Sequence, residues 1–130
     1  GINIIRSYNN LIRNNIIMGN WVYGLYIRSH SNNNTICNNL IIDSSSDGIY
    51  IQNSDGNVIS NNVISDGYGG VSLRASSYNS IINNIILNNN GGIAIAFDSC
   101  NNTSLAQERY ELLREIFLQD SEDMFDNCTR

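Results

Sequence analysis

The sequence has no proline and no lysine, and it contains one histidine and one tryptophan. Because proline cannot donate a backbone hydrogen bond, its absence leaves every N–H able to pair with a neighbouring strand. The seven arginines are outnumbered by 12 acidic residues, which gives a net charge of -5. A chain of that charge repels the phosphates of nucleic acids and anionic membranes, so we expect neither as a partner.

Long apolar runs are also missing. No segment approaches the roughly 20 apolar residues of a membrane-spanning helix. The N-terminus lacks the basic segment followed by an apolar stretch that is typical of a targeting signal. Because Gly1 already occupies the glycine position of the repeat described below, we expect a mature or truncated product.

Cysteine is scarce, since Cys37, Cys100 and Cys128 are too few for a disulfide scaffold. A disulfide between Cys100 and Cys128 would fasten the C-terminus in an oxidising compartment. The alternative is three free, mostly buried thiols.

Glycine and asparagine recur at intervals of 22 to 24 residues along most of the chain, and residues 48–66 show one complete unit. The glycines are Gly1, Gly24, Gly48, Gly70 and Gly92, and the asparagines that follow them are Asn10, Asn34, Asn57, Asn79 and Asn101. A period of this length predicts a repeat architecture.

Each unit contains three short stretches in which apolar and polar residues alternate, as in a strand with one buried face. The first follows the glycine, the second follows the asparagine, and the third follows an Asn-Asn pair. The apolar residues of the second stretch are Ile12, Ile36, Ile59 and Ile81, with Thr103 in the last unit. Three strands in about 22 residues leave no room for crossover helices, so the units must stack ~4.8 Å apart as a parallel β-helix. Stacked asparagines can then hydrogen-bond along the axis.

The third stretch predicts an apolar outer face. If the second asparagine of each pair faces inward, one set of residues lies in the core: Ile17, Ile41, Ile64 and Ile86. The opposite register swaps which apolar column is exposed. The outward pairs are Ile16 with Met18, Leu40 with Ile42, Val63 with Ser65, and Ile85 with Leu87. Leaving each apolar side chain in water would forgo ~1.5–3 kcal/mol, so something should cover this face.

From Ser104 the repeat gives way to an amphipathic pattern, in which Ser104 and Gln107 form a capping box. One stripe contains Leu105, Arg109, Leu112, Leu113, Ile116 and Phe117. We expect a helix that packs along the apolar third-strand face or caps the end of the stack. The division is therefore a β-helix over residues 1–103, and a helix with an acidic tail over residues 104–130.

Two motifs resemble the turns of the right-handed parallel β-helix repeat family: Gly48-Ile49-Tyr50-Ile51-Gln52-Asn53-Ser54 and Asn57-Val58-Ile59-Ser60-Asn61-Asn62. The resemblance covers residues 1 to about 103 and implies an all-β, right-handed parallel β-helix of about five rungs. The family includes carbohydrate-binding modules, polysaccharide lyases, hydrolases and epimerases, periplasmic copper-maturation proteins, and surface adhesins. It therefore implies an extracellular, cell-surface or periplasmic chain with a glycan-related role.

Outward positions of the first strand provide the candidate glycan-binding residues, which we call the binding strip: Tyr26, Arg28, Tyr50, Gln52, Ser72 and Arg74. Tyrosine rings stack on sugar faces, while arginine and glutamine reach hydroxyls or carboxylates. The alternative is ordinary packing between rungs.

Asp43 and Asp66 share a column one rung apart, with Asp47 close in sequence. Such carboxylates can hold calcium or share a proton as an acid–base pair, and they can equally be turn residues. His30 falls in a column whose other members are Ser7, Ser54, Ser76 and Asp98. A copper site made by His30 and Cys37 would lack further ligands.

These patterns favour a non-catalytic structural or carbohydrate-binding module, because the chain has no lysine and no Gly-His-Gly run. Copies of the chain can associate through rung ends or the apolar third-strand face. The alternative is a fragment of a polysaccharide lyase or hydrolase whose catalytic rungs lie outside this chain. An ice-binding surface would need regular threonine ladders, and the outward columns are too mixed.

Overall fold

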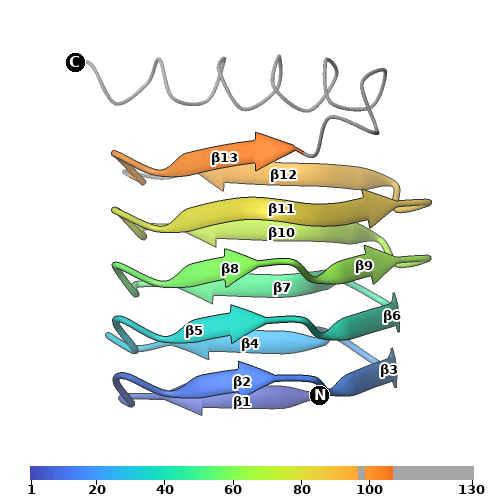
Figure 1. Ribbon diagram of the computed structural model, residues 1–130, viewed down its shortest axis with the longest axis horizontal. Coiled ribbons are helices and arrows are strands. Elements are labelled where there is room, and N and C mark those ends of the chain that lie inside the picture. Colours follow the sequence, from blue (N-terminus) through green and yellow to red (C-terminus); the bar gives the residue numbers. More distant parts are fainter. Residues whose placement is uncertain (97–98, 107–130) are drawn as a thin grey trace.

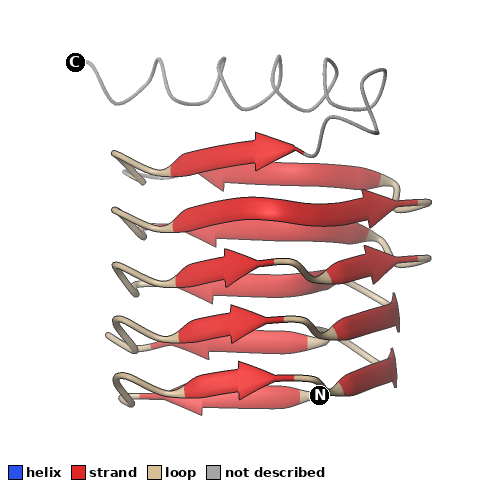
Figure 2. Cartoon of the chain, in the orientation of Figure 1, coloured by secondary structure: helices blue, strands red, loops and turns tan. Residues whose placement is uncertain are grey.

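The computed structural model describes residues 1–96 and 99–106, and every regular element within them is a β-strand (Figure 2). The strands are β1 (Ile2–Ile5), β2 (Leu11–Arg13), β3 (Ile16–Asn20), β4 (Leu25–Arg28), β5 (Thr35–Cys37), β6 (Leu40–Ser44), β7 (Asp47–Gln52), β8 (Val58–Ser60), β9 (Val63–Ser65), β10 (Gly69–Arg74), β11 (Ser80–Leu87), β12 (Gly91–Ala96) and β13 (Thr103–Ala106). Within this part of the chain no helix is long and apolar enough to cross a membrane.

The strands form two parallel sheets that run the height of the stack (Figure 1). One sheet has the order β1-β4-β7-β10-β12. The other has the order β2-β5-β8-β11-β9-β6-β3, with β13 also paired to β11. The chain therefore forms an all-β solenoid of about four turns, and β12 and β13 begin a further turn.

Isoleucines from successive turns fill the inside of the coil. Ile49 pairs in register with Leu25 in one neighbouring strand and Val71 in the other, and all three side chains are fully buried. The predicted core positions of the third strand are also buried: Ile17, Ile41, Ile64 and Ile86. Because equivalent positions of successive turns hold similar residues, the apolar side chains of each turn pack against those of the next.

Asparagine ladders join the turns at two corners of the coil. In the first ladder both the backbone N–H and the Nδ2–H of Asn34 donate to Oδ1 of Asn57, at 2.9 and 3.1 Å. The second ladder repeats this geometry, with Asn39 donating twice to Asn62 at 2.9 and 3.0 Å. These asparagines are buried, and each amide satisfies a backbone N–H that the turn would otherwise leave without a partner.

The first asparagine of each Asn-Asn pair has a different role from the second. Its backbone is left-handed, with φ between 56° and 59° at Asn14, Asn38, Asn61 and Asn83. Asparagine tolerates this conformation better than most residues. The resulting bend directs the second asparagine of the pair into the ladder.

The last repeat unit is one residue longer than predicted, so two of its positions were assigned wrongly. Asn102 rather than Asn101 continues the ladder, because its Oδ1 accepts the N–H of Asn79 at 2.7 Å. Ser104 rather than Thr103 pairs with Ile81. Asn101 has a φ of 54° and occupies the turn.

The predicted start of the C-terminal helix is also wrong. Residues 103–106 form β13 in parallel with β11, so the strand pattern continues past the predicted boundary at residue 103. An open sheet edge offers a row of backbone donors and acceptors, and pairing with it overrides a local helical preference. The rest of the predicted helix and the acidic tail, residues 107–130, lie outside the described residues.

The apolar face of the third strand is most exposed in the first turn. Ile16 and Met18 are 71% and 63% exposed. The corresponding apolar residues of the later turns are half-buried: Leu40, Ile42, Val63, Ile85 and Leu87. The predicted outward direction is confirmed for the apolar residues of this column, whereas Ser65, predicted to point outward with Val63, is buried.

Candidate functional site

The structure brings all six residues of the binding strip onto one face of the five-stranded sheet. Tyr26 pairs in register with Tyr50, and Tyr50 with Ser72. In the adjoining column Arg28 pairs with Gln52, and Gln52 with Arg74. Residues two apart in a strand point to the same side, so the two columns form one continuous outward surface.

Three tyrosines gather at one end of this surface, and we call them the tyrosine triad. The rings of Tyr26 and Tyr50 are stacked, with centroids 5.1 Å apart and planes inclined by 17°. Tyr23 lies 4.9 Å from Tyr26 and 4.7 Å from Tyr50 in tilted orientations. Such pairs add about 0.5–1.5 kcal/mol each beyond the area that they bury. The triad is therefore a rigid, partly exposed aromatic cluster.

Sequence reasoning missed Tyr23, because it lies in a turn before the glycine position and outside the strand pattern. The signal that could have found it is its position directly before Gly24. The backbone N–H of Gly24 donates to the carbonyl of Asp47 at 3.2 Å. That bond brings the turn beside the start of the strand that carries Tyr50.

Polar contacts orient the side chains around the triad. The Tyr26 hydroxyl donates to Oε1 of Gln52. The guanidinium carbon of Arg28 lies 5.2 Å from the centre of the Tyr26 ring, within the range of a cation–π contact. The Nε of Arg28 is buried and makes no hydrogen bond within the described residues. Arg28 is therefore held by a ring rather than by a carboxylate.

Asp47, at the start of β7, supplies the carboxylate of this region. Burial raises the pKa of Asp47 above its ordinary value, and a hydrogen bond from Ser72 partly opposes the shift. Burial also raises the pKa of Tyr23, assisted by the charges of Tyr50 and Asp47. The local environment thus disfavours negative charge at this end of the sheet.

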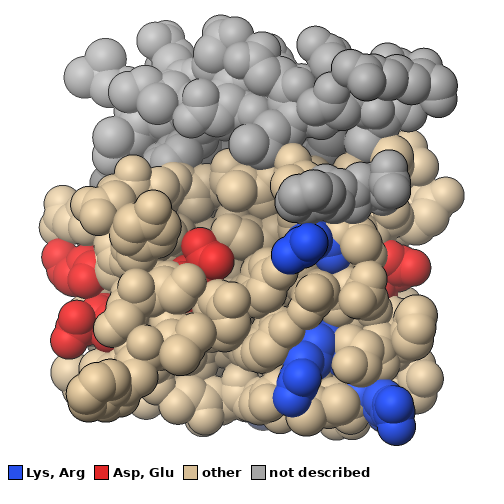
Figure 3. Space-filling view, turned by 180° about the vertical axis from the view of Figure 1, so that it is seen from behind, with Lys and Arg blue, Asp and Glu red and all other residues tan. Residues whose placement is uncertain are grey.

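Charge is distributed unevenly over the outer face of this sheet. The face is turned to the viewer in Figure 3, where the arginine atoms lie in the right half and the acidic atoms lie at the left edge, near the middle and at the right edge. Arg28 and Arg74 are the last residues of β4 and β10, whereas Asp47 is the first residue of β7. The two charges therefore occupy opposite ends of the strands.

Asp43 and Asp66 are aligned one turn apart, as predicted, because the residues before them pair as Ile42 with Ser65. Both have left-handed backbones, with φ of 57° and 58°. The Asp66 carboxylate accepts hydrogen bonds from Ser65 (2.8 Å) and from Asn88 (3.3 Å). These are the contacts of turn residues.

Asp43, Asp47 and Asp66, the predicted calcium ligands, do not form a cluster. Over residues 1–96 and 99–106, no three His, Cys, Asp or Glu side chains lie close enough together to hold a metal ion.

The predicted column of His30 is wrong. The serine ladder passes through Ser31, whose Oγ accepts the N–H of Ser7 at 3.2 Å and whose N–H donates to Ser54 at 3.0 Å. Ser99, not Asp98, continues the ladder by accepting the N–H of Ser76 at 3.0 Å. The second and last units each have one extra residue in this turn. His30 is exposed there, with a φ of 65°.

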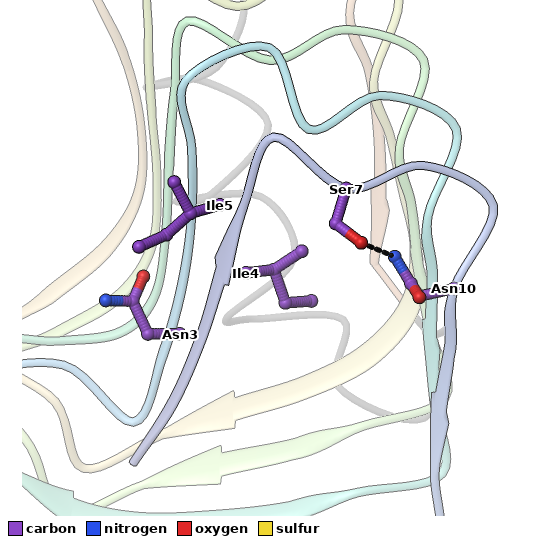
Figure 4. A pocket seen from close by; sticks show the side chains of 5 residues that line it. All are labelled: Asn3, Ile4, Ile5, Ser7 and Asn10. Atoms are coloured by element: carbon purple, nitrogen blue, oxygen red, sulfur yellow. Dashed lines mark hydrogen bonds between the residues drawn. The ribbon is translucent and has the colours of Figure 1, made fainter.

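A hollow of about 380 Å³ lies at the β1–β2 end of the stack (Figure 4). Its lining residues are Asn3, Ile4, Ile5, Ser7 and Asn10. Nδ2 of Asn10 donates to Oγ of Ser7 across it at 2.8 Å. Two of its lining residues, Asn3 and Ile5, pair in register with Tyr26 and Arg28 of the binding strip, so the hollow borders the strip at the first turn.

Comparison with protein families supports the fold. Residues 1–107 match the family described as periplasmic copper-binding protein (NosD). The chain belongs to the NosD family. No curated protein and no solved structure matches it. NosD proteins are periplasmic by this description, which confirms the expected location outside the cytoplasm.

The copper in the NosD description can be tested against the donors of this chain. Copper prefers imidazole and thiolate ligands. Among the described residues those donors are His30, Cys37 and Cys100, and no group of three metal-ligating side chains includes any of them. Within the described residues of this NosD chain, the His, Cys, Asp and Glu side chains therefore form no copper site of three ligands. Cys128 lies outside them, so the predicted Cys100–Cys128 disulfide stays a prediction.

Proposed function

We propose that this chain is a non-catalytic β-helix module, acting outside the cytoplasm, that binds a polysaccharide or a cell-surface glycan on the binding strip. The main support for the proposal is that the tyrosine triad lies next to short side chains in the same outward column of the sheet. Partly exposed aromatic rings held in a fixed orientation are suited to stacking on sugar rings.

The outward column changes abruptly in size after Tyr50. Its members in successive turns are Tyr26, Tyr50, Ser72 and Ala94. One face of the Tyr50 ring meets Tyr26. The opposite face lies on the side of Ser72, where the next side chains are a hydroxymethyl and a methyl group. A sugar ring placed over Ser72 and Ala94 would contact that face of Tyr50.

Polar side chains border the same place. Gln52 and Arg74 stand in the neighbouring column, beside Tyr50 and Ser72 respectively. Their amide and guanidinium groups are donors for sugar hydroxyl or carboxylate oxygens. Stacking would thus supply affinity, and these donors would set the orientation of the sugar.

Catalysis is not part of this proposal. Glycoside hydrolysis normally uses two carboxyl groups that flank one bond, and Asp47 is the carboxylate that contacts the strip through Ser72. The alternative remains that the chain is a piece of a polysaccharide lyase or hydrolase. A longer polypeptide with further rungs bearing clusters of Asp, Arg or Lys would favour that alternative. The right-handed sense of the coil and a complete fifth rung also stay predictions.

The test is a glycan-array screen of the whole chain, followed by calorimetric titration of the strongest ligand. Tyr50→Ala should weaken binding by about ten-fold or more, as expected for an aromatic anchor. Tyr50→Phe keeps the ring and should bind nearly as well. The matched control is Tyr8→Ala, because Tyr8 is 55% exposed and lies outside the strip.

Circular dichroism and thermal unfolding must show that each variant is folded. An array without any ligand, or a folded Tyr50→Ala variant with unchanged affinity, would overturn the proposal.

A further inference from the structure

Two exposed aromatic rings lie at one corner of the coil, in the turns that lead into the five-stranded sheet. These turns join β3 to β4, β6 to β7 and β9 to β10 (Figure 1). Trp21 lies in the first of them and is 92% exposed, and Tyr68 lies in the third and is 64% exposed. Ser45, in the turn between, is also exposed. Neither ring is part of the buried core, so both are available to a ligand.

Backbone hydrogen bonds align these residues in successive turns. The N–H of Ser45 donates to the carbonyl of Asn20 at 2.9 Å, and the N–H of Tyr68 donates to the carbonyl of Ser44 at 3.1 Å. In a parallel pair of strands, such a bond goes to the residue that precedes the partner. Trp21, Ser45 and Tyr68 therefore form one column, which we call the aromatic corner.

The spacing of the aromatic corner suits a sugar ring. Trp21 and Tyr68 are two turns apart, which corresponds to roughly 10 Å along the axis at ~4.8 Å per strand. A sugar ring that contacts both aromatic rings at ~3.5–4.0 Å on each side needs a gap of roughly 7–8 Å. The Ser45 side chain between them is short, and its hydroxyl can donate to or accept from a sugar hydroxyl. Two aromatic walls with a polar floor fit a carbohydrate better than a wholly apolar partner.

The aromatic corner adjoins the binding strip. Tyr23 of the triad lies two residues after Trp21, and its ring centre is 4.7 Å from that of Tyr50. Tyr68 precedes Ser72 by four residues, which is roughly 13 Å of strand at ~3.3 Å per residue. A sugar over Ser72 and a sugar at the aromatic corner would therefore lie on one continuous path around the side of the coil.

Charge near the aromatic corner favours a neutral sugar. Asp43 and Asp66 each lie two residues before a member of the corner, and both are exposed. These carboxylates, on a chain whose net charge is -5, disfavour an acidic sugar there. In glucose-type pyranoses all substituents are equatorial, so C–H groups form both faces of the ring. Burial of such faces against aromatic rings is favourable.

We propose that the aromatic corner is a second sugar-binding position beside the binding strip, and that the glycan is a neutral oligosaccharide of glucose-type rings, long enough to reach from Ser72 to Trp21. This inference rests on the proposed function and adds the class, charge and minimum length of the ligand.

The experiment uses Trp21 as its own probe, because it is the only tryptophan in the chain. Cellobiose, cellohexaose, chitobiose and chitohexaose are each titrated into the whole chain. At least one hexasaccharide should shift the fluorescence emission of Trp21 to shorter wavelength, because a stacked sugar removes the indole from water. The same hexasaccharide should bind about ten-fold more tightly than its disaccharide.

Variants assign this gain in affinity with chain length to the corner. Trp21→Ala should remove most of the gain, whereas Trp21→Tyr, which keeps an aromatic ring, should retain it. Tyr78→Ala is the matched control and should keep the full gain, because Tyr78 is 67% exposed in the turn between β10 and β11. A hexasaccharide also offers more binding positions than a disaccharide, so the comparison between variants is the decisive measurement. Circular dichroism must show that each variant is folded.

Five results would overturn this inference: no shift of the Trp21 emission with a saturating hexasaccharide, no gain in affinity with chain length in the wild-type chain, the same gain in Trp21→Ala, no binding of any of the four sugars, or an emission that shifts on dilution without sugar. The last would mean that a second copy of the chain covers the corner. In each case the proposed function still stands if the glycan array yields a ligand whose binding is weakened in Tyr50→Ala. An array without any ligand would overturn both.

Discussion

Asn57 is joined to Asn79 twice: its backbone N–H and its Nδ2–H both donate to Oδ1 of Asn79, at 2.8 and 3.1 Å. Oδ1 of Asn57 in turn accepts the N–H of Asn34 at 2.9 Å. The asparagine ladder therefore has a direction, with each rung donating to the rung that follows it. One side chain thus serves both neighbouring rungs.

Asn57→Ala should be strongly destabilising because it removes this double role. The buried N–H of Asn34 would lose its acceptor, and an unsatisfied buried polar group costs about 1–3 kcal/mol. With the lost donors included, we expect a decrease of about 2–4 kcal/mol in the free energy of unfolding, measured by urea denaturation. The control is Asn90→Ala, an exposed asparagine that should change stability by less than about 0.5 kcal/mol. Equal effects of the two variants would contradict the ladder.

Gly48→Ala should be destabilising for a steric reason. A Cβ at Gly48 would lie 2.3 Å from Cγ2 of Ile64, a core side chain, and 3.1 Å from the carbonyl oxygen of Gly70. Overpacking of this kind costs about 1–3 kcal/mol. A Cβ at Gly91 would meet nothing closer than 3.9 Å, so Gly91→Ala should be nearly neutral. Thermal unfolding of the two variants side by side checks this prediction, and a Gly48→Ala variant as stable as Gly91→Ala would refute it.

Asp47→Asn should stabilise the fold in a pH-dependent way. Because burial raises the pKa of Asp47 in the folded state, the folded chain holds this proton more tightly than the unfolded chain. The wild-type protein then loses stability as pH rises from 3.8, the ordinary pKa of an aspartate side chain, through the raised pKa of Asp47. The variant has no such loss of stability. Above this pH range it should therefore be more stable than the wild-type protein, and below this range the two should be equally stable.

The measurement for Asp47 is the melting temperature as a function of pH. Asp43→Asn is the matched control, because Asp43 is exposed and reports the loss of one negative charge alone. A stability difference that is the same at every pH would argue against the effect of burial.

Met18→Lys should reduce any association between copies of the chain. Ile16 and Met18 form the most exposed part of the apolar third-strand face, and a charge there would have to be desolvated in a contact between copies. We expect the wild-type chain to sediment as an oligomer and the variant to shift towards the monomer, with the folded-state stability nearly unchanged. Tyr78→Lys is the control, since Tyr78 is 67% exposed in a turn. A monomeric wild-type chain would exclude this surface as an interface.

The columns of the repeat could be predicted from sequence because they are periodic. Residues such as Ile49 and Ile51 return at the same position of every unit, and stacking with any other register would expose them. Tyr26 and Tyr50 were placed on one surface by the same reasoning. Errors arose where a unit gained one residue, as at His30 and Asn101, since an extra turn residue shifts the alignment without changing the strand pattern.

The sequence by itself therefore determined the solenoid, its isoleucine core and its asparagine ladders, because those features repeat and each copy constrains the next. Only the tertiary structure decided that Tyr23 completes the triad, that Asp47 is half-buried beside Ser72, and that residues 103–106 form a strand. These features depend on contacts made once, between residues at non-repeated positions of neighbouring turns. Local propensity and periodicity do not predict such contacts.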